Sequence, residues 1–248
     1  MTAEFWLNSN NLGELLGHLY SERGLSDRKL QMLCCAFCLR QSRHISAVGV
    51  RHLLTQMESF ADRELARDEL RTTRRHVRSH SDVGQYGYER ENLSSVVHYA
   101  IVQLAAWFMV DPESPYQWEY EDDLPVDWYE QQRMPYPIWT AQIISEAIDS
   151  DVEITEGWSF ERDQQLLFLR DIFGNPFRSV EIDPRWRTSN VVDLSQAIYQ
   201  EQAFERMPIL ADALMDAGCD SEEMLNHCRG DGPHARGCWV VDLLLGKE

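Results

Sequence analysis

The sequence predicts a mainly α-helical, multi-helix globular protein with at most a minor β element. Two observations lead to this prediction. Apolar residues recur at helical spacing in most segments, and helix-capping or helix-breaking residues fall at the ends of those segments. By contrast, one short stretch, RSVEIDPRW at 178–186, is the only segment with the character of an extended strand.

Composition and charge narrow the class of protein. The 248 residues include 44% hydrophobic side chains, which is enough for one large core or two small ones. The chain has 41 acidic and 23 basic residues, so its formal net charge is −18, which disfavours nucleic acid or an anionic membrane as a partner. No signal pattern and no spanning apolar segment is apparent. We therefore expect a cytoplasmic protein with six reduced cysteines.

The first expected region is helical and covers residues 1–110. Its predicted helices lie at 11–23, 26–41, 47–60 and 92–110. The second of these helices contains LQMLCCAFCL, which is apolar nearly all round and should be central to the region. Free cysteine is among the most buried residue types, so we predict that Cys34, Cys35 and Cys38 are core residues.

A polar segment at 61–80 forms the only basic surface that the sequence predicts. Five arginines follow one helical stripe, namely Arg63, Arg67, Arg71, Arg74 and Arg78. Acidic residues are interleaved with them, namely Asp62, Glu64, Asp68 and Glu69. This pattern favours ion pairs along a solvated helix over a nucleic-acid contact.

The second expected region, residues 111–136, is an acidic arm or linker rich in proline and aromatic residues. Five of the nine prolines lie between Asp111 and Pro137, so a regular element is not expected there. From Asp111 to Glu156, 13 acidic residues are opposed only by Arg133. A dense acidic surface with exposed aromatics could dock a basic or apolar protein.

The third expected region, residues 137–248, is helical and ends in a Cys/His cluster. Its predicted helices lie at 138–149, 159–173, 189–204, 208–218, 222–229 and 234–245. Cys228 stands six residues before His234, and Cys238 follows His234 by one helical turn. These three residues, with His227 or Cys219 as a fourth ligand, match the ligand types of a structural zinc site.

Two other interpretations of this cluster remain open. The cysteines could be unliganded core residues beside a hydrogen-bonded histidine. Alternatively, Cys228 or Cys238 could be a catalytic nucleophile with His234 as its base. Arg229 and Arg236 flank the loop, and we expect them to pair with Asp231, Asp242 or the C-terminal carboxylate. The expected cofactor is accordingly none or zinc.

Several stretches carry a resemblance to a known family. They are DRKLQMLCCAFCLR, RDIFGNPF, ILADALMDAGC and HCRGDGPHARGCWVVDLLLGKE. They cover roughly half of the chain and resemble a large paralogous family of uncharacterised proteins from planctomycete bacteria. The resemblance implies an intracellular, mostly helical protein present in many diverged copies, and it implies no reaction.

Two hypotheses of function follow. The first is a non-enzymatic interaction or regulatory module, with a protein partner favoured over a small molecule and with a structural metal site in its C-terminal region. The alternative is a thiol- or zinc-dependent hydrolase centred on Cys228, His234 and Cys238. The sequence leaves open whether the protein is an enzyme.

Overall fold

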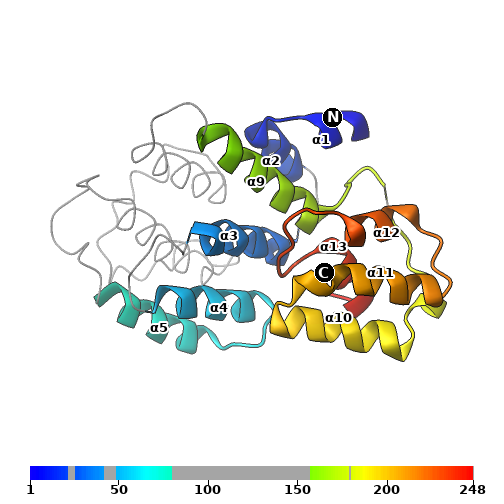
Figure 1. The fold of residues 1–248 in the computed structure, drawn as a ribbon. Coiled ribbons are helices and arrows are strands. Elements are labelled where there is room, and N and C mark those ends of the chain that lie inside the picture. Colours follow the sequence, from blue (N-terminus) through cyan, green and yellow to red (C-terminus); the bar gives the residue numbers. More distant parts are fainter. Residues whose placement is uncertain (22–25, 42–48, 80–156, 179, 248) are drawn as a thin grey trace. The chain divides into compact units, whose positions relative to one another are not determined.

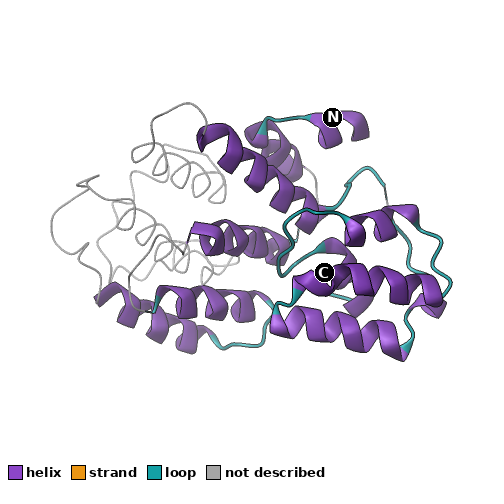
Figure 2. Ribbon diagram, in the orientation of Figure 1, coloured by secondary structure: helices purple, strands orange, loops and turns teal. Residues whose placement is uncertain are grey.

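The computed structural model describes residues 1–21, 26–41, 49–79, 157–178 and 180–247. These residues form ten α-helices and no strand, and 72% of them are helical, so the predicted mainly α-helical class is confirmed (Figure 2). The helices predicted at 92–110 and 138–149 and the arm at 111–136 lie outside the described residues. The three expected regions therefore remain predictions.

The chain divides into two compact units. Unit 1 comprises residues 1–33 and 162–248, and unit 2 comprises residues 34–161. The division falls within helix α3 (Asp27–Gln41), whose first two turns belong to unit 1. Across the described residues, no helix is long and apolar enough to cross a membrane.

Unit 2 contains α4 (Val50–Ala61) and α5 (Arg67–Ser79), which pack against each other. Leu53 and Met57 of α4 are fully buried, as is Leu70 of α5. The three cysteines of α3 have no exposed surface either, which confirms their predicted burial.

The predicted arginine stripe is wrong at two of its positions. Arg63 has a φ of 60° and lies in the turn between α4 and α5, so it is not on the helix. Arg74 is only 6% exposed, because it falls on the same face of α5 as the buried Leu70 and Val77. The predicted ion pairing is observed between Arg71 and Asp68, at 3.1 Å.

Unit 1 begins with α1 (Ala3–Asn8) and α2 (Leu12–Ser21), and α9 (Gly157–Phe173) enters it at Arg162. Buried Trp6 of α1 donates its indole N–H to the carbonyl oxygen of Gly174, at 2.9 Å. In return, Arg170 of α9 donates to the carbonyl oxygens of Trp6 and Ser9. These bonds satisfy carbonyls at the ends of both helices, which helix geometry leaves without partners.

The rest of unit 1 is a cluster of short helices with one core. In chain order they are the 3-10 helix η2 (Pro184–Trp186), α10 (Ser189–Glu201), the 3-10 helix η3 (Phe204–Arg206), α11 (Met207–Asp216), α12 (Glu222–Arg229) and α13 (Trp239–Leu245). As Figure 1 shows, α10 packs against α11 and α13, and α11 packs against α12. Tyr199, Leu210, Leu214 and Val241 are among the residues of their shared core.

Local capping explains where these helices start. The hydroxyl of Thr188 accepts from the backbone N–H of Val191, and that of Ser221 accepts from Met224. Pro208 stands at the start of α11, where its missing N–H has no cost. The helix predicted at 222–229 is found with those bounds. The stretch 180–183 forms no strand and leads directly into η2.

The predicted final helix at 234–245 is wrong at its start, since α13 begins only at Trp239. Gly237 has a φ of 93°, a left-handed conformation that interrupts a right-handed helix. Cys238 is the residue that caps α13, and its φ of −47° is paired with an extended ψ of 124°. His234 and Cys238 therefore do not share a helical face, although they still meet, as described next.

Candidate metal centre

A group of four potential metal ligands lies within unit 1: Asp171, His227, His234 and Cys238. Each residue offers one ligand atom, and these four atoms lie within 4.8 Å of one another. Three different parts of the fold supply the group. Asp171 is near the end of α9, His227 is near the end of α12, and the other two lie in the segment that leads into α13.

The carboxylate of Asp171 is at the middle of this group. Its Oδ1 atom lies 2.6 Å from Nδ1 of His234 and 3.2 Å from Nε2 of His227. Its Oδ2 atom accepts from the backbone N–H of Ala235, at 3.0 Å. Asp171 is only 3% exposed, so these contacts replace the water that an exposed carboxylate would bind.

Burial and hydrogen bonding act in opposite directions on this carboxyl. Burial raises the pKa of Asp171, but the hydrogen bonds with His227 and His234 lower it, and the net pKa lies below its usual value. Asp171 is therefore a carboxylate at neutral pH. For Cys238, burial and then the negative charge of Asp171 raise the pKa of the thiol well above its usual value. Without a metal ion, Cys238 is a neutral thiol.

A single nitrogen of His227 faces two groups at once. Its Nε2 atom lies 3.2 Å from Sγ of Cys238 and 3.2 Å from Oδ1 of Asp171. In a catalytic triad the nucleophile contacts one nitrogen of the histidine and the carboxylate contacts the other, so that the ring accepts the proton of the nucleophile while the carboxylate orients the ring and stabilises its charge. Convergence of an oxygen, a sulfur and a nitrogen on one point is instead the arrangement of metal ligands.

Two contacts in the group have distances close to those of a zinc site, while the four ligand atoms together spread over up to 4.8 Å. Zinc bonds of about 2.0–2.3 Å at tetrahedral angles place neighbouring ligand atoms roughly 3.3–3.6 Å apart. Both contacts of His227, at 3.2 Å, are already near this spacing. The pair formed by Asp171 and His234, at 2.6 Å, would have to open by roughly 0.7 Å, which a side-chain rotation can supply.

The described residues leave one polar atom of the group without a hydrogen-bond partner. An ionised carboxylate can only accept, so Nδ1 of His234 carries the proton that it shares with Asp171. The buried Nε2 atom of His234 then has no hydrogen-bond partner among the described residues. An unsatisfied buried nitrogen is unfavourable. Zinc bound at Nδ1, in place of the proton shared with Asp171, would leave Nε2 unsatisfied, so this atom alone does not argue for the ion.

The structure brings together three of the four ligands that the sequence suggested: His227, His234 and Cys238. Cys228 is fully buried but is not part of the group, and its burial raises the pKa of its thiol to about 12. It follows His227 on α12 and points into the core that also contains Cys219. Among the described residues, Arg229 pairs with Asp212, at 3.0 Å, and not with Asp231 or Asp242.

Sequence reasoning missed Asp171. The residue lies 56 positions before His227. No rule of ligand spacing in the sequence links a residue so far away to the C-terminal Cys/His cluster. One signal was present in the sequence. Asp171 follows Arg170 within the otherwise apolar run LLFLRDIF, and a charged residue on a buried helical face needs a specific partner.

Comparisons with protein-family models, with curated proteins and with solved structures give no match for this chain. The resemblance to the planctomycete family thus stays a prediction. The geometry defines the class of the site, which is a buried Asp/His/His/Cys group that could hold a metal ion.

Proposed function

We propose that unit 1 is a zinc-binding module in which Asp171, His227, His234 and Cys238 hold one Zn²⁺ ion. The observation that carries the proposal is the convergence of their ligand atoms within 4.8 Å. The ion would connect α9 to α12 and to the start of α13. Because the ligands come from distant parts of the chain, zinc bound to the folded state alone would stabilise this arrangement.

The ligand types favour zinc over other common ions. Mg²⁺ and Ca²⁺ prefer sites made of oxygen atoms, whereas two imidazoles and a thiolate suit Zn²⁺. The carboxylate of Asp171 and the thiolate form of Cys238 would together neutralise a divalent ion. A neutral complex is important here, since Asp171 and Cys238 are almost completely buried and an uncompensated charge would be costly.

A structural role has more support than a catalytic one. Four protein ligands fill a tetrahedral site and leave no open position for a substrate or a water molecule. We therefore propose a non-enzymatic interaction or regulatory module, whose protein partner would bind the acidic arm predicted at 111–136. The thiol-hydrolase alternative has less support. A nucleophilic cysteine must be accessible to its substrate and needs a lowered pKa, whereas Cys238 has no exposed surface and its pKa is raised.

Elemental analysis of the purified full-length protein tests this proposal. We expect zinc at close to one equivalent per chain, and loss of that zinc in Cys238→Ala. Cys228→Ala is the matched control, because it removes a second fully buried thiol that lies outside the group. It should keep its zinc. A wild-type protein without bound metal, or equal zinc content in the two variants, would refute the proposed site.

A further inference from the structure

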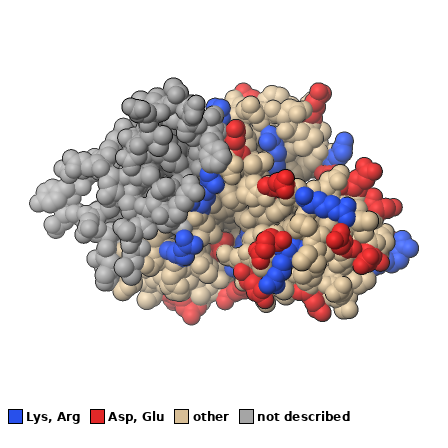
Figure 3. Space-filling view, in the orientation of Figure 1, with Lys and Arg blue, Asp and Glu red and all other residues tan. Residues whose placement is uncertain are grey.

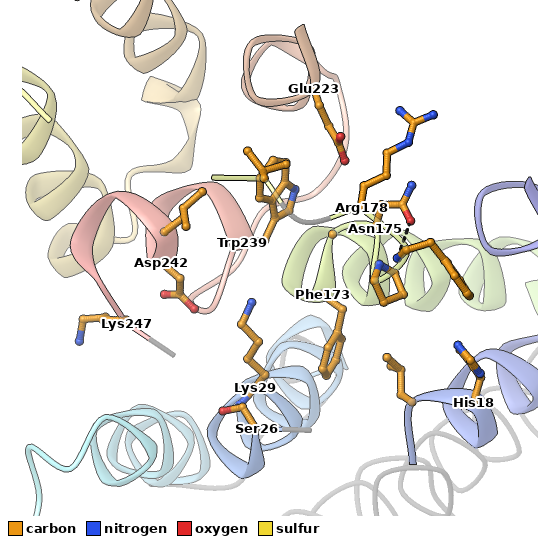
Figure 4. Close-up of a pocket in the computed structure, with 16 residues that line it drawn as sticks. His18, Ser26, Lys29, Phe173, Asn175, Arg178, Glu223, Trp239, Asp242 and Lys247 are labelled. Atoms are coloured by element: carbon orange, nitrogen blue, oxygen red, sulfur yellow. Dashed lines mark hydrogen bonds between the residues drawn. The ribbon is translucent and has the colours of Figure 1, made fainter. Parts of the chain in front are cut away.

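Unit 1 also contains a cleft of about 610 Å³ that is separate from the four metal ligands. Its walls come from α2, the start of α3, the segment 173–180, α12 and α13, and Figure 4 shows the side chains that line it. The volume falls in the range of sites that bind small organic molecules. Apolar and aromatic residues form much of its lining, namely Leu19, Phe173, Phe177, Val180, Trp239 and Leu243.

The aromatic side chains that line this cleft are held in place by contacts with other lining residues. The indole of Trp239 packs on the bare backbone of Gly174, where an added Cβ would lie only 3.1 Å from the indole Cγ atom. On another wall, His18 and Phe177 stack with ring centroids 5.2 Å apart and an angle of 6° between the ring planes. Flat surfaces that are already fixed in position bind a flat ligand with little loss of entropy.

The chain has only two lysines, Lys29 and Lys247, and both line this cleft although 218 positions separate them. At all other positions its basic residues are arginines. In Figure 4 the Lys29 side chain points into the middle of the cleft-lining residues, toward Trp239 and between Asp242 and Phe173. A lysine ammonium is a compact charge that fits a narrow position where a planar guanidinium does not.

The ammonium of Lys29 has unused hydrogen-bonding capacity. Among the described residues, its one hydrogen-bond partner is the carbonyl oxygen of Ile172, at 2.9 Å. An ammonium has three N–H donors, so two remain for a molecule in the cleft. A hydrogen bond between a partly buried ammonium and an anion is among the stronger polar interactions in proteins.

The charges around the cleft favour an anion. Lys29, Lys247 and Arg178 contribute three positive charges, and Glu223 and Asp242 contribute two negative ones. The carboxylate of Asp242 acts on Lys29 and is also paired with Arg28, at 2.7 Å, so Asp242 and Arg28 together add no net charge at the cleft. A local excess of positive charge is unusual in a chain whose net charge is −18, and it would concentrate small anions at this position.

We propose that this cleft binds a small organic anion with a flat apolar body, whose acidic group contacts Lys29 and whose body lies against Trp239 and Phe173. This function goes beyond the zinc module and does not depend on bound metal. The anionic group would be a carboxylate or a phosphate, since both accept charge-assisted hydrogen bonds from an ammonium.

The two lysines allow a direct test by NMR. In full-length protein labelled with ¹³C only at lysine, the Cε region holds two signals, which Lys29→Arg and Lys247→Arg assign. We expect phenylacetate to shift the Lys29 signal saturably at millimolar concentration or below. Phenylacetamide, which has the same shape but no charge, should shift it far less. Phenyl phosphate and inorganic phosphate then show which acidic group is preferred and whether the apolar body contributes.

Variants separate binding in the cleft from weak adhesion elsewhere, with calorimetry as the readout. Lys29→Met should weaken phenylacetate binding at least tenfold, because it removes a charge-assisted hydrogen bond. Arg178→Ala, a change at an exposed position of the wall, should weaken it several-fold and leave the fold intact even if Lys29→Met does not fold. Arg206→Met removes a cation outside the cleft and should have no effect. Equal responses to phenylacetate and phenylacetamide, or unchanged binding in Arg178→Ala and Lys29→Met, would overturn the proposal.

Discussion

Arg28 at the start of α3 donates two hydrogen bonds to the carboxylate of Asp242 on α13, at 2.7 and 3.1 Å. It also donates to the hydroxyl of Tyr199, at 2.8 Å. Asp242 is 1% exposed and Arg28 is 12% exposed, so the pair is largely removed from water. By contrast, side chains of both signs are interspersed on the face drawn in Figure 3, where solvent screens them.

We predict that Arg28→Ala lowers the free energy of unfolding by about 3–5 kcal/mol, because it leaves a buried carboxylate without its guanidinium partner. Urea unfolding of the full-length protein measures this loss. Arg206→Ala is a suitable control, since its pair with Glu201 is solvent-exposed and should be worth no more than about 1 kcal/mol. The double variant Arg28→Met with Asp242→Leu should be more stable than Arg28→Ala. Similar losses in Arg28→Ala and Arg206→Ala would contradict this account.

Gly237 combines two constraints at the start of α13. Its φ is 93°, and an added Cβ would lie 2.8 Å from Cβ of Met32. Gly218 has a similar φ of 83° but has nothing within 4 Å of the added atom. We predict that Gly218→Ala costs about 1–2 kcal/mol from the backbone alone, and that Gly237→Ala costs clearly more. Thermal or urea unfolding gives the difference between them. Equal losses would mean that Met32 does not pack against this turn as described.

The six cysteines should be unreactive in the native protein. All are free and buried, and burial raises the pKa of Cys38 to about 12 and that of Cys34 well above its usual value. At pH 8 both thiols would therefore be almost entirely un-ionised, and the thiol is much less nucleophilic than the thiolate. We predict that a maleimide reagent labels six thiols in urea and none rapidly under native conditions, as read by intact mass. Rapid native labelling of Cys34 or Cys38 would show that α3 is not a core helix.

Much of the fold could be predicted from local patterns. The helix at 222–229 was predicted with its observed bounds, because Ser221 is a cap and Gly230 directly follows the last turn. The final helix was predicted five residues too early, because helical periodicity alone does not reveal the left-handed φ of Gly237, where an added Cβ would lie 2.8 Å from Cβ of Met32. Arg74 was predicted to be exposed, although its helical position beside Leu70 already indicated burial.

The candidate site could be predicted only in part, because some of its contacts depend on long-range packing. His227, His234 and Cys238 lie within 12 consecutive residues, so their ligand chemistry is visible in the sequence. Asp171 joins them only through the packing of α9 against the C-terminal segment, which is a long-range property. Cys228 was suggested by its spacing and lies in the same buried core as Cys238, but its thiol is not among the converging ligand atoms.

X-ray absorption at the zinc edge of the metal-loaded full-length protein tests the central claim most directly, because it reports the ligand atoms themselves. The account predicts one sulfur at about 2.3 Å, from Cys238, and three nitrogen or oxygen atoms at roughly 2.0–2.1 Å, from His227, His234 and Asp171. Cys228→Ala should leave this spectrum unchanged. Two sulfur ligands would instead place Cys228 at the metal, and a shell without sulfur would contradict the centre described here.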